Sequence, residues 1–304
     1  MRFPFSPIDY HEPVFRPPSE ASSFILQITL GCSWNRCAFC EMYQSKRFRV
    51  RSLEEIESDL KQAARLWPDT RRVFLADGDP LVLAPSRLLP ILEMIRKYLP
   101  AAQRISAYAS PRNLAARTVE ELAAIRGAGL NLVYVGIESG DDCLLERIQK
   151  GETAATIISG LNHAAQAGIR RSVMILIGLG GETLSRQHAE QSARVVNETR
   201  PEHLSTLVLR FPLGENRFRS LFGADYRPLD YLGHLREMRL FLCGLSLDRT
   251  VFRSDHISNV LALRGTLSRD RDPLVARLDR FLLDIEKNPG PWEREFRDRD
   301  QRSL

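Results

Sequence analysis

The chain has 304 residues, of which 43% are hydrophobic, and a formal net charge of +5. This length suits one large α/β domain or a domain with a modest appendage, and the apolar fraction is ample for a core. No apolar run approaches the ~20 residues of a membrane span, and the first residues lack the apolar stretch of a secretory signal, so we expect neither.

Three of the five cysteines fall between positions 32 and 40. This clustering argues for metal ligation in a reducing compartment, most naturally the cytoplasm, and against a disulfide framework. The mild positive charge permits an anionic substrate or RNA, but arginines scattered on solvated faces explain it equally well.

Strand-like and helix-like runs alternate along most of the chain. Residues 1–23 are rich in proline and aromatic residues without periodicity, so we expect an extended arm there. Ser52 and Glu55, like Thr118 and Glu121, have the spacing of a capping box that opens a helix. Strands are predicted at residues 24–30, 72–76, 105–109, 131–137, 172–177 and 203–211. Helices are predicted at residues 52–67, 85–98, from 118, 141–149, 153–167, from 183, 231–245 and 274–284.

Six strand–helix units with short connections predict an α/β fold with a parallel sheet and right-handed crossovers. The strands are almost continuously apolar, which is typical of strands covered on both faces. In such folds the chemistry lies at the carboxyl ends of the strands. Unusual polar residues should therefore cluster just after each strand.

The stretch that follows the first strand carries Cys32, Cys37 and Cys40, with Tyr43 three residues further on. Structural zinc sites and ordinary iron–sulfur clusters usually take four protein ligands. Three thiolates therefore leave one coordination position for a group that is not protein. A zinc site completed by a distant histidine, or unrelated buried thiols, are the alternative explanations.

Polar residues also follow the later strands. Asp77, Gly78 and Asp79 come after the second strand, Ser110 after the third and Glu138 after the fourth, with Lys150 further along. Each has an ordinary structural explanation: an acidic turn, a packed turn residue, or a cation solvated at a helix end. A carboxylate at a buried strand end is costly unless it is paired or hydrogen-bonded, and this singles out Glu138.

The cysteine loop and the segment around Glu138 together resemble the radical S-adenosylmethionine (SAM) superfamily, and the likeness covers roughly residues 22–212. The Glu138 segment is similar to the branch with the tRNA methylthiotransferases, the oxygen-independent coproporphyrinogen oxidases and the elongator catalytic subunit. One feature departs from the pattern: four residues separate Cys32 from Cys37, where the superfamily usually has three. The loop must bulge by one residue, and Cys32 is the ligand that this affects.

The resemblance implies a fold, cofactors and site residues. The fold would be a partial (β/α)6 TIM-like barrel of mostly parallel strands with an N-terminal arm and a short C-terminal extension. Cys32, Cys37 and Cys40 would bind one [4Fe–4S] cluster, and SAM would chelate its fourth iron. The resemblance assigns the SAM contacts to Phe39 beside the adenine, to the 77–79 turn, and to Ser110, Glu138 and Lys150. Because Asp replaces the first Gly and the Glu of the superfamily's Gly-Gly-Glu-Pro turn, backbone carbonyls are the alternative contacts at Asp77–Asp79.

Four expectations for domains follow: an arm at 1–23, a radical SAM core at 24–212, an extension closing the barrel at 213–290 and a polar tail at 291–304. In the extension, Asp255, His256, Ser258 and Asn259 put four hydrogen-bonding side chains into five positions. We expect this stretch to line the substrate cavity, with His256 exchanging protons near neutral pH. Asp255 and Tyr43 complete the catalytic candidates.

The sequence thus predicts a cytoplasmic radical SAM enzyme. The reduced cluster would cleave SAM to methionine and a 5′-deoxyadenosyl radical, which would abstract hydrogen from an unidentified small molecule or RNA. The partners would be a reductant such as flavodoxin or ferredoxin, and no membrane. The rival readings are a non-catalytic zinc or iron–sulfur module and an RNA-modifying member of the same superfamily.

Overall fold

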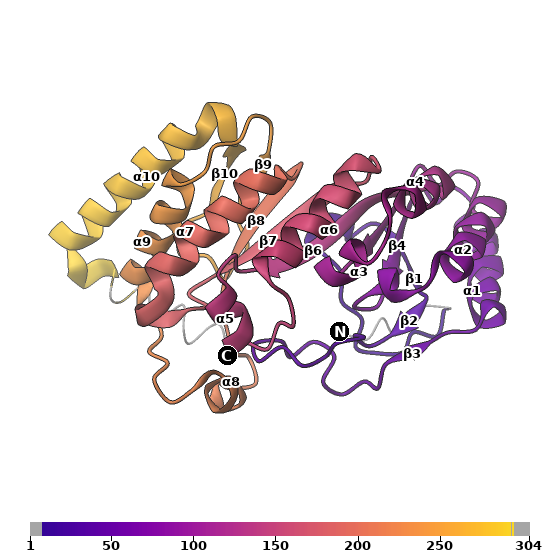
Figure 1. The fold of residues 1–304 in the computed structure, drawn as a ribbon, viewed down its shortest axis with the longest axis horizontal. Coiled ribbons are helices and arrows are strands. Elements are labelled where there is room, and N and C mark those ends of the chain that lie inside the picture. The colour runs from indigo at the N-terminus through magenta and orange to yellow at the C-terminus, as the bar shows by residue number, and fades with distance from the viewer. Residues whose placement is uncertain (1–7, 293, 295–304) are drawn as a thin grey trace. The chain divides into compact units, whose positions relative to one another are not determined.

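The computed structural model describes residues 8–292 and 294 (Figure 1). Residues 1–7 of the expected arm, and residues 293 and 295–304 of the expected tail, lie outside the described residues. The strands are β1 (Phe24–Gln27), β2 (Thr29–Leu30), β3 (Arg49–Val50), β4 (Arg72–Ala76), β5 (Arg104–Tyr108), β6 (Leu130–Glu138), β7 (Arg170–Ile177), β8 (His203–Val208), β9 (Val251–Ser254) and β10 (Leu263–Thr266). The helices are α1 (Leu53–Leu66), α2 (Pro85–Tyr98), α3 (Pro111–Ala115), α4 (Val119–Ala128), α5 (Asp142–Arg147), α6 (Ala154–Gln166), α7 (Gly181–Thr199), α8 (Asn216–Phe222), α9 (Tyr231–Cys243) and α10 (Leu267–Lys287).

Eight strands form one sheet in the order β1-β4-β5-β6-β7-β8-β9-β10. The pairs β1–β4, β4–β5, β5–β6 and β8–β9 are parallel, and only the last, β9–β10, is antiparallel among the pairs described in full. The predicted fold class, an α/β fold with mostly parallel strands alternating with helices, is confirmed. The sheet has two more strands than the six predicted, because the C-terminal segment adds β9 and β10.

The chain divides into two compact units. Unit 1 contains residues up to 36, 40–136 and 156–172, and unit 2 contains residues 37–39, 137–155 and 173 onward. Unit 1 contains the strands β1, β4, β5 and the first part of β6, together with the helices α1, α2, α3, α4 and most of α6. Unit 2 contains the strands β8, β9 and β10 and the helices α7, α9 and α10. Helix α9 packs against both α7 and α10.

The predicted strand at 24–30 is divided in the structure. After β1, the amide of Ile28 still donates to the carbonyl of Ala76 at 2.7 Å, but Thr29 and Leu30 turn away and pair with β3 in a separate two-stranded sheet. The amide of Asp77 in turn donates to the carbonyl of Thr29 at 3.1 Å. The cysteine loop therefore begins directly beside the carboxyl end of β4.

Local sequence signals fix the helix starts in unit 1. Ser52 accepts a hydrogen bond from the amide of Glu55 at 3.1 Å while the Glu55 carboxylate accepts from the amide of Ser52 at 2.6 Å. Thr118 and Glu121 form the same reciprocal pair at the start of α4. Both capping boxes were predicted, and both satisfy backbone donors that a helix start would otherwise leave unpaired.

One face of the unit 1 sheet is covered by the N-terminal arm. Ile25, Phe74 and Ala76 form a buried cluster on this face, and Tyr108 and Tyr134 pack against it from β5 and β6. From the arm, Tyr10 and Val14 pack on the same cluster, and the Tyr10 hydroxyl donates to the carbonyl of Ile25 at 2.9 Å. The arm is thus part of the hydrophobic core of unit 1.

A buried carboxylate fixes the end of the arm. Glu20 is fully buried, and it accepts hydrogen bonds from Arg104 at 2.8 Å and Tyr134 at 2.6 Å, and a further short one from Ser23. Burial acts to raise the pKa of Glu20, but the hydrogen bonds from Ser23, Tyr134 and Arg104 outweigh it and leave the pKa below its ordinary value.

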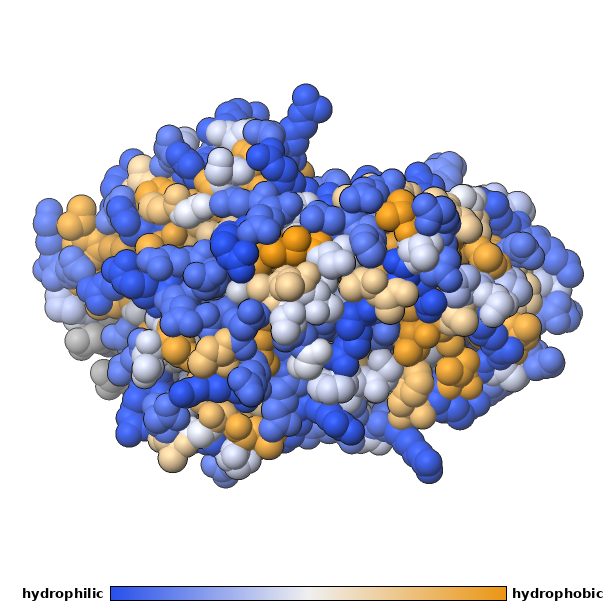
Figure 2. Space-filling view, in the orientation of Figure 1, coloured by the Kyte–Doolittle hydropathy of each residue, from blue (hydrophilic) through white to orange (hydrophobic). Residues whose placement is uncertain are grey.

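None of the helices in the described part of the chain is long and apolar enough to cross a bilayer. The face seen in Figure 2 is covered mainly by hydrophilic side chains, and the apolar residues on it are scattered.

Candidate functional site

The three loop cysteines are partly exposed, whereas Cys143 and Cys243 are exposed on helices elsewhere. Cys32 and Cys40 belong to unit 1, and Cys37 belongs to unit 2 with Phe39. In unit 1, Asn35 takes a left-handed φ of 47°, and its side-chain amide donates to the carbonyl of Tyr43 at 2.9 Å. Asparagine tolerates this conformation better than most residues, so Asn35 suits a bulged turn between the first two cysteines.

In unit 2, Arg217 of α8 holds the middle of the cysteine loop. Its guanidinium donates to the carbonyls of Cys37, at 3.0 Å, and Ala38, at 2.6 Å. The amide of Ala38 donates to the carbonyl of Ile148 at 2.8 Å. Arg217 was not predicted, because it lies 180 residues from Cys37 in the sequence and one arginine among many gives no signal by itself.

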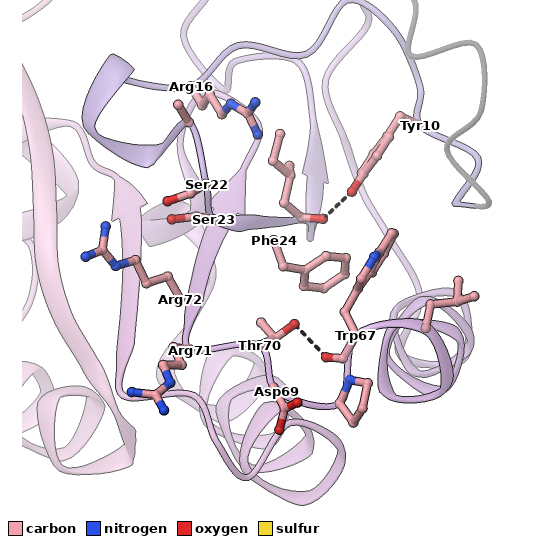
Figure 3. A pocket seen from close by; sticks show the side chains of 14 residues that line it. Tyr10, Arg16, Ser22, Ser23, Phe24, Trp67, Asp69, Thr70, Arg71 and Arg72 are labelled. Carbon is pink, nitrogen blue, oxygen red and sulfur yellow. Dashed lines mark hydrogen bonds between the residues drawn. The ribbon is translucent and has the colours of Figure 1, made fainter.

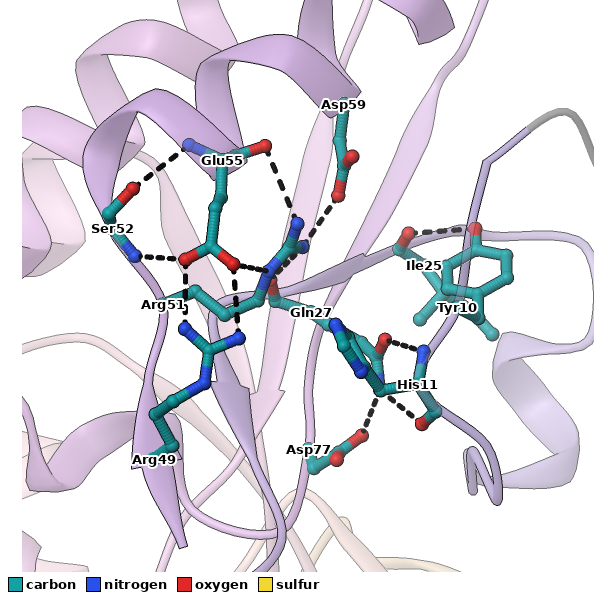
Figure 4. A network of polar contacts seen from close by, with 10 residues as sticks. All are labelled: Tyr10, His11, Ile25, Gln27, Arg49, Arg51, Ser52, Glu55, Asp59 and Asp77. Carbon is teal, nitrogen blue, oxygen red and sulfur yellow. Dashed lines mark hydrogen bonds and ion pairs between the residues drawn. The ribbon is translucent and has the colours of Figure 1, made fainter.

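The carboxylate of Asp77, directly after β4, is fully buried, and both of its oxygens accept hydrogen bonds from protein donors. Its Oδ1 accepts from Gln27 at 2.9 Å, and its Oδ2 accepts from the amide of Gly31 at 2.9 Å and from Lys46 at 2.8 Å. Figure 4 shows Gln27 between Asp77 and His11 of the arm. Asp77 therefore ties β1, the arm and the residue before Cys32 together.

Asp79, the other acidic residue of this turn, is also buried and saturated. Its Oδ2 accepts from the hydroxyls of Ser33 at 2.7 Å and Ser110 at 3.2 Å, and from the amide group of Asn113 at 2.5 Å. Its Oδ1 accepts from the backbone amide of Ser110 at 3.2 Å. Burial raises the pKa of Asp79, and the bonds from Ser33, Ser110 and Asn113 oppose that rise.

Gly78 separates the two acidic residues and leaves room for their neighbours. A Cβ at position 78 would stand 3.0 Å from the Cβ of Cys32 and 2.9 Å from the ring of Tyr43. The Tyr43 side chain is only 3% exposed, and its hydroxyl has no hydrogen-bond partner among the described residues. Burial raises the pKa of Tyr43, and the negative groups of Asp77, Tyr108, Cys32 and Cys40 add to the rise.

Glu138 ends β6 in a strained and buried position. Its φ is +64°, in the left-handed region that residues other than glycine rarely occupy, and the residue is 4% exposed. Its Oε1 accepts from Lys150 at 3.4 Å, and its Oε2 has no partner among the described residues. Burial raises the pKa of Glu138, while Lys150 opposes the rise. Lys150 also lies 5.8 Å from the centre of the Phe39 ring.

A network that the sequence did not reveal supports the turn after Glu138. His188 of α7 is fully buried, and its Nε2 donates to the carbonyl of Leu176 at 3.0 Å. Its Nδ1 is then the acceptor facing the hydroxyl of Ser139 at 2.9 Å and that of Ser192 at 3.3 Å. The same two hydroxyls accept the amides of Asp141 and Gly140, respectively, in the turn itself.

Another buried carboxylate supports the turn after β7. Glu237 of α9 accepts from the amide of Gly178 at 2.7 Å, and its Oε1 lies 3.6 Å from His188 Nε2. Burial raises the pKa of Glu237, against the opposing effects of His188, Gly178 and Ser185. Helical positions 188 and 237 give no sequence signal, because a buried polar residue in a helix looks like part of an ordinary amphipathic pattern.

The polar stretch after β9 divides into a buried half and an exposed half. Ser258 and Asn259 are buried: the hydroxyl of Ser258 accepts from the amide of Val208 at 3.2 Å, and Asn259 donates to the carbonyl of Thr206 at 2.9 Å. Both bonds attach the stretch to the end of β8. Asp255 and His256 are exposed, and His256 Nδ1 lies 2.8 Å from the Ser258 hydroxyl.

A cavity of about 1020 Å³ lies at the opposite end of the unit 1 strands, where β1 and β4 begin (Figure 3). Its lining residues include Trp67, Arg71, Arg72 and Phe24, and the tilted rings of Phe24 and Trp67 are 6.1 Å apart. None of the predicted site residues is among those that line it. The cavity is therefore separate from the carboxyl-end cluster of Asp77, Asp79 and the cysteine loop.

A parallel sheet with a three-cysteine loop after its first strand, and a buried carboxylate–lysine pair after a later one, define a class of cluster-binding α/β proteins. The chain belongs to the radical SAM superfamily, because the family model "Radical SAM superfamily" matches residues 26–192, more than half of the chain. The predicted resemblance is confirmed. Membership in this family implies a [4Fe–4S] cluster and SAM as the cofactors.

Curated relatives and solved structures agree with this membership. The chain is 27% identical to the heme chaperone HemW of Bacillus subtilis over 47% of this chain and 37% of that protein. It is 24% identical to the putative methylthiotransferase MJ0865 of Methanocaldococcus jannaschii, over 66% of this chain and 47% of the relative. The fold is similar to that of coproporphyrinogen III oxidase (HemN) from Escherichia coli, with a TM-score of 0.54 and 19% identity over 73% of this chain and 52% of that one. The chain spans less than half the length of the curated relatives it matches.

The described residues fit both cofactors. No three His, Cys, Asp or Glu side chains within residues 8–292 and 294 form a preassembled metal site, but three thiols on one short loop are the soft donors that iron–sulfur clusters use. Gly78 leaves the space beside Cys32 that a Cβ would fill. For SAM, Lys150 offers a cation to a carboxylate, and Glu138 Oε2 offers an acceptor to an ammonium or hydroxyl group.

Proposed function

We propose that this protein is a single-cluster radical SAM enzyme that generates a radical from SAM and uses it to abstract hydrogen from a substrate. In this proposal Cys32, Cys37 and Cys40 bind the cluster. Phe39, Ser110, Glu138, Lys150 and the backbone carbonyls of the turn at Asp77, Gly78 and Asp79 would surround SAM. When bound, the two cofactors supply the reductive cleavage of SAM to methionine and a 5′-deoxyadenosyl radical.

The observation that carries the proposal is that Glu138 has both a strained backbone and a buried carboxylate. A left-handed backbone at a residue other than glycine costs of order 1–3 kcal/mol and persists where the surroundings over-determine it. Here the serine hydroxyls facing His188 hold the turn that follows Glu138. The buried Oε2 of Glu138, which has no partner within the described part of the chain, adds a further cost. A ligand that donates a hydrogen bond to Oε2 would remove that cost.

The residues of unit 2 would bind and orient the amino-acid part of SAM. Lys150 provides a positive charge in a site that is largely shielded from solvent, which suits a carboxylate. The apolar ring of Phe39 lies close to Lys150 and offers a stacking surface for an adenine. In unit 1, the Tyr43 hydroxyl would donate a hydrogen bond toward the cysteine sulfurs, because burial keeps it protonated.

Asp255 and His256 are proposed to contact the substrate. Ser258 and Asn259 attach the stretch that carries them to β8, the sixth predicted strand. The stretch therefore lies beside the end of that strand. Partial burial of its ring lowers the pKa of His256, against the opposing charge of Asp255, so the ring is mostly neutral at pH 7 and can accept a proton. The substrate class, a small molecule or an RNA, is part of the proposal and is open to test.

The reaction requires an electron donor, and we propose a flavodoxin or ferredoxin. A loop that binds a cluster through three cysteine thiolates also needs a reducing environment, so we propose the cytoplasm as its location.

The decisive test is SAM cleavage by anaerobically reconstituted protein. With iron, sulfide and dithionite supplied, the protein should hold about four irons per chain and release 5′-deoxyadenosine and methionine from SAM, detected by mass spectrometry. A variant with all three loop cysteines replaced by alanine is the matched control. Iron without SAM cleavage would favour a redox module, and a single zinc ion resistant to iron exchange would favour a structural metal site.

A further inference from the structure

The Asp77–Gly78–Asp79 turn lies where the resemblance puts a SAM contact, yet its side chains are already engaged elsewhere. We propose that this turn is a clamp that fixes Cys32 as a preorganised iron ligand by holding its two chain neighbours, and that neither carboxylate binds SAM. The inference rests on the proposed function, since it assigns Cys32 to the cluster.

The clamp grips both sides of Cys32. The carboxylate of Asp77 accepts the amide of Gly31, immediately before the cysteine, and the carboxylate of Asp79 accepts the hydroxyl of Ser33, immediately after it. Between them, the amide of Gly78 donates to the carbonyl of Gly31 at 3.0 Å. Three consecutive residues of the turn thus bind the two residues that flank Cys32.

Neither carboxylate has room for SAM. Asp77 is 0% exposed and Asp79 is 2% exposed, and each of their four oxygens already accepts at least one hydrogen bond from the protein. Because the protein encloses both carboxylates, an ammonium group could reach them only if the buried donors around them moved, and a displaced donor would lose its partner. The turn can still offer backbone carbonyls to SAM without this conflict.

Helix α3 also holds the Asp79 carboxylate in place. Ser110 and Asn113, at the start of and within α3, both donate to the Asp79 carboxylate. From the same helix, the guanidinium of Arg112 lies 3.9 Å from the centre of the Trp34 ring, two residues after Cys32. Ser110 is thereby a positioning residue, which acts on the cysteine loop through Asp79.

The longer loop explains what the clamp achieves. Four residues separate Cys32 from Cys37, and each added loop residue increases the number of conformations that must be lost when the ligands close on a metal. Fixing Cys32 before iron arrives removes part of that loss, as preorganised ligand sites do. The prediction is that weakening the clamp speeds the loss of iron, while SAM affinity stays the same wherever the cluster is intact.

Two substitutions test the clamp from its two ends. In Asp79→Asn and in Ser33→Ala, iron release from the reconstituted protein to a ferrous chelator should be at least about tenfold faster than in the wild type. The SAM dissociation constant, measured on the fraction that retains its cluster, should stay within about threefold of the wild-type value. Because the two residues act through one bond, the double variant should release iron about as fast as the faster single variant.

The matched control is Asp59→Asn. Asp59 also lies in unit 1 and pairs with Arg51 at 2.6 Å, but within the described part of the chain no hydrogen bond or ion pair joins it to the residues beside Cys32. This control should lower the melting temperature without speeding iron release.

Several outcomes would overturn the clamp. One is wild-type iron retention in Asp79→Asn together with a tenfold or greater loss of SAM affinity, which would make Asp79 a SAM ligand. Additive effects of Ser33→Ala and Asp79→Asn would also refute it, as would equal iron loss in Asp59→Asn. If Asp79→Asn fails to fold, Ser33→Ala alone decides by the same two measurements. A wild-type protein that assembles no cluster would overturn the proposed function and the clamp together, and is thus distinguishable from a failure of the clamp alone.

Discussion

Lys150 Nζ lies 3.4 Å from Glu138 Oε1, and the side chains are 14% and 5% exposed, respectively. The pair joins the end of β6 to a residue three positions after the end of α5, so a buried carboxylate and its cation meet beside a strained backbone. Removing one member of a buried pair leaves the other charge uncompensated, which is costly. The pair therefore links the stability of this strand end to its binding properties.

Lys150→Met should weaken SAM binding roughly 10- to 100-fold, because a desolvated charge-assisted contact contributes about 1.5–3 kcal/mol. Glu138→Gln should have a smaller effect, because the amide still accepts a hydrogen bond. Isothermal titration of reconstituted protein measures both. Lys61→Met is the control, since Lys61 forms an exposed pair with Glu57. Unchanged SAM affinity in Lys150→Met would show that this lysine serves only to neutralise Glu138.

Cys37→Ala should abolish the broad visible absorbance of the cluster and reduce the iron content, because only three protein ligands are available. Cys143→Ala and Cys243→Ala should retain both signals, since these thiols are exposed on α5 and at the end of α9. Iron and sulfide analysis alongside absorbance spectra decides the matter. Bleaching by Cys243→Ala, with no bleaching by Cys32→Ala, would refute the ligand set.

The sequence predicted those features of the fold that depend on neighbouring residues. The capping boxes at Ser52 and Thr118 are local, and both helices begin where they indicate. The last helix was predicted to start at residue 274, but α10 begins at Leu267 and includes Pro273. Proline favours the first turn of a helix, and this bias misplaced the predicted start by about two turns.

Features that depend on distant residues were not predictable from one sequence. No strand was predicted at Val251–Ser254, yet these residues form β9, because β8 offers a parallel partner that only the folded chain supplies. The acidic turn was found, but the protein donors that bind its carboxylates were not, because Lys46 and Gln27 approach Asp77 from other elements. Pairing across such separations leaves no pattern in the sequence.

Tyr43→Phe should make the reduction potential of the cluster more negative, because a hydrogen bond donated toward the sulfurs stabilises the reduced state. The unloaded protein should be at least as stable as the wild type, since the substitution removes a buried hydroxyl that has no partner among the described residues. A redox titration followed by electron paramagnetic resonance measures the potential. Tyr226→Phe is the control, because that hydroxyl donates to Gly178 in unit 2. An unchanged potential in Tyr43→Phe would contradict the proposed donor.

Glu20 should make the docking of the arm sensitive to acid. Its pKa is lower in the folded protein than its ordinary value of 4.5. The stability it contributes is therefore fully present above pH 4.5 and is lost as the pH falls through the folded pKa. Glu20→Gln should lower the melting temperature at pH 7, and the difference from the wild type should shrink as the pH falls below about 4. A difference independent of pH would show that Glu20 acts by packing alone.

His256→Ala should separate SAM cleavage from turnover of the substrate. The ring is exposed and bonds only locally, to Ser258 two residues away, so its removal should leave the fold and the cluster intact. SAM cleavage without substrate, measured as 5′-deoxyadenosine, should therefore match the wild type. A strain that lacks the gene should accumulate the substrate, whether a metabolite or an RNA. Expression of His256→Ala in that strain should leave the accumulated substrate unprocessed. Ile257→Ala is the matched neighbour, because Ile257 is 93% exposed, and it should restore processing. Full processing by His256→Ala, or loss of its cluster, would place His256 among the structural residues.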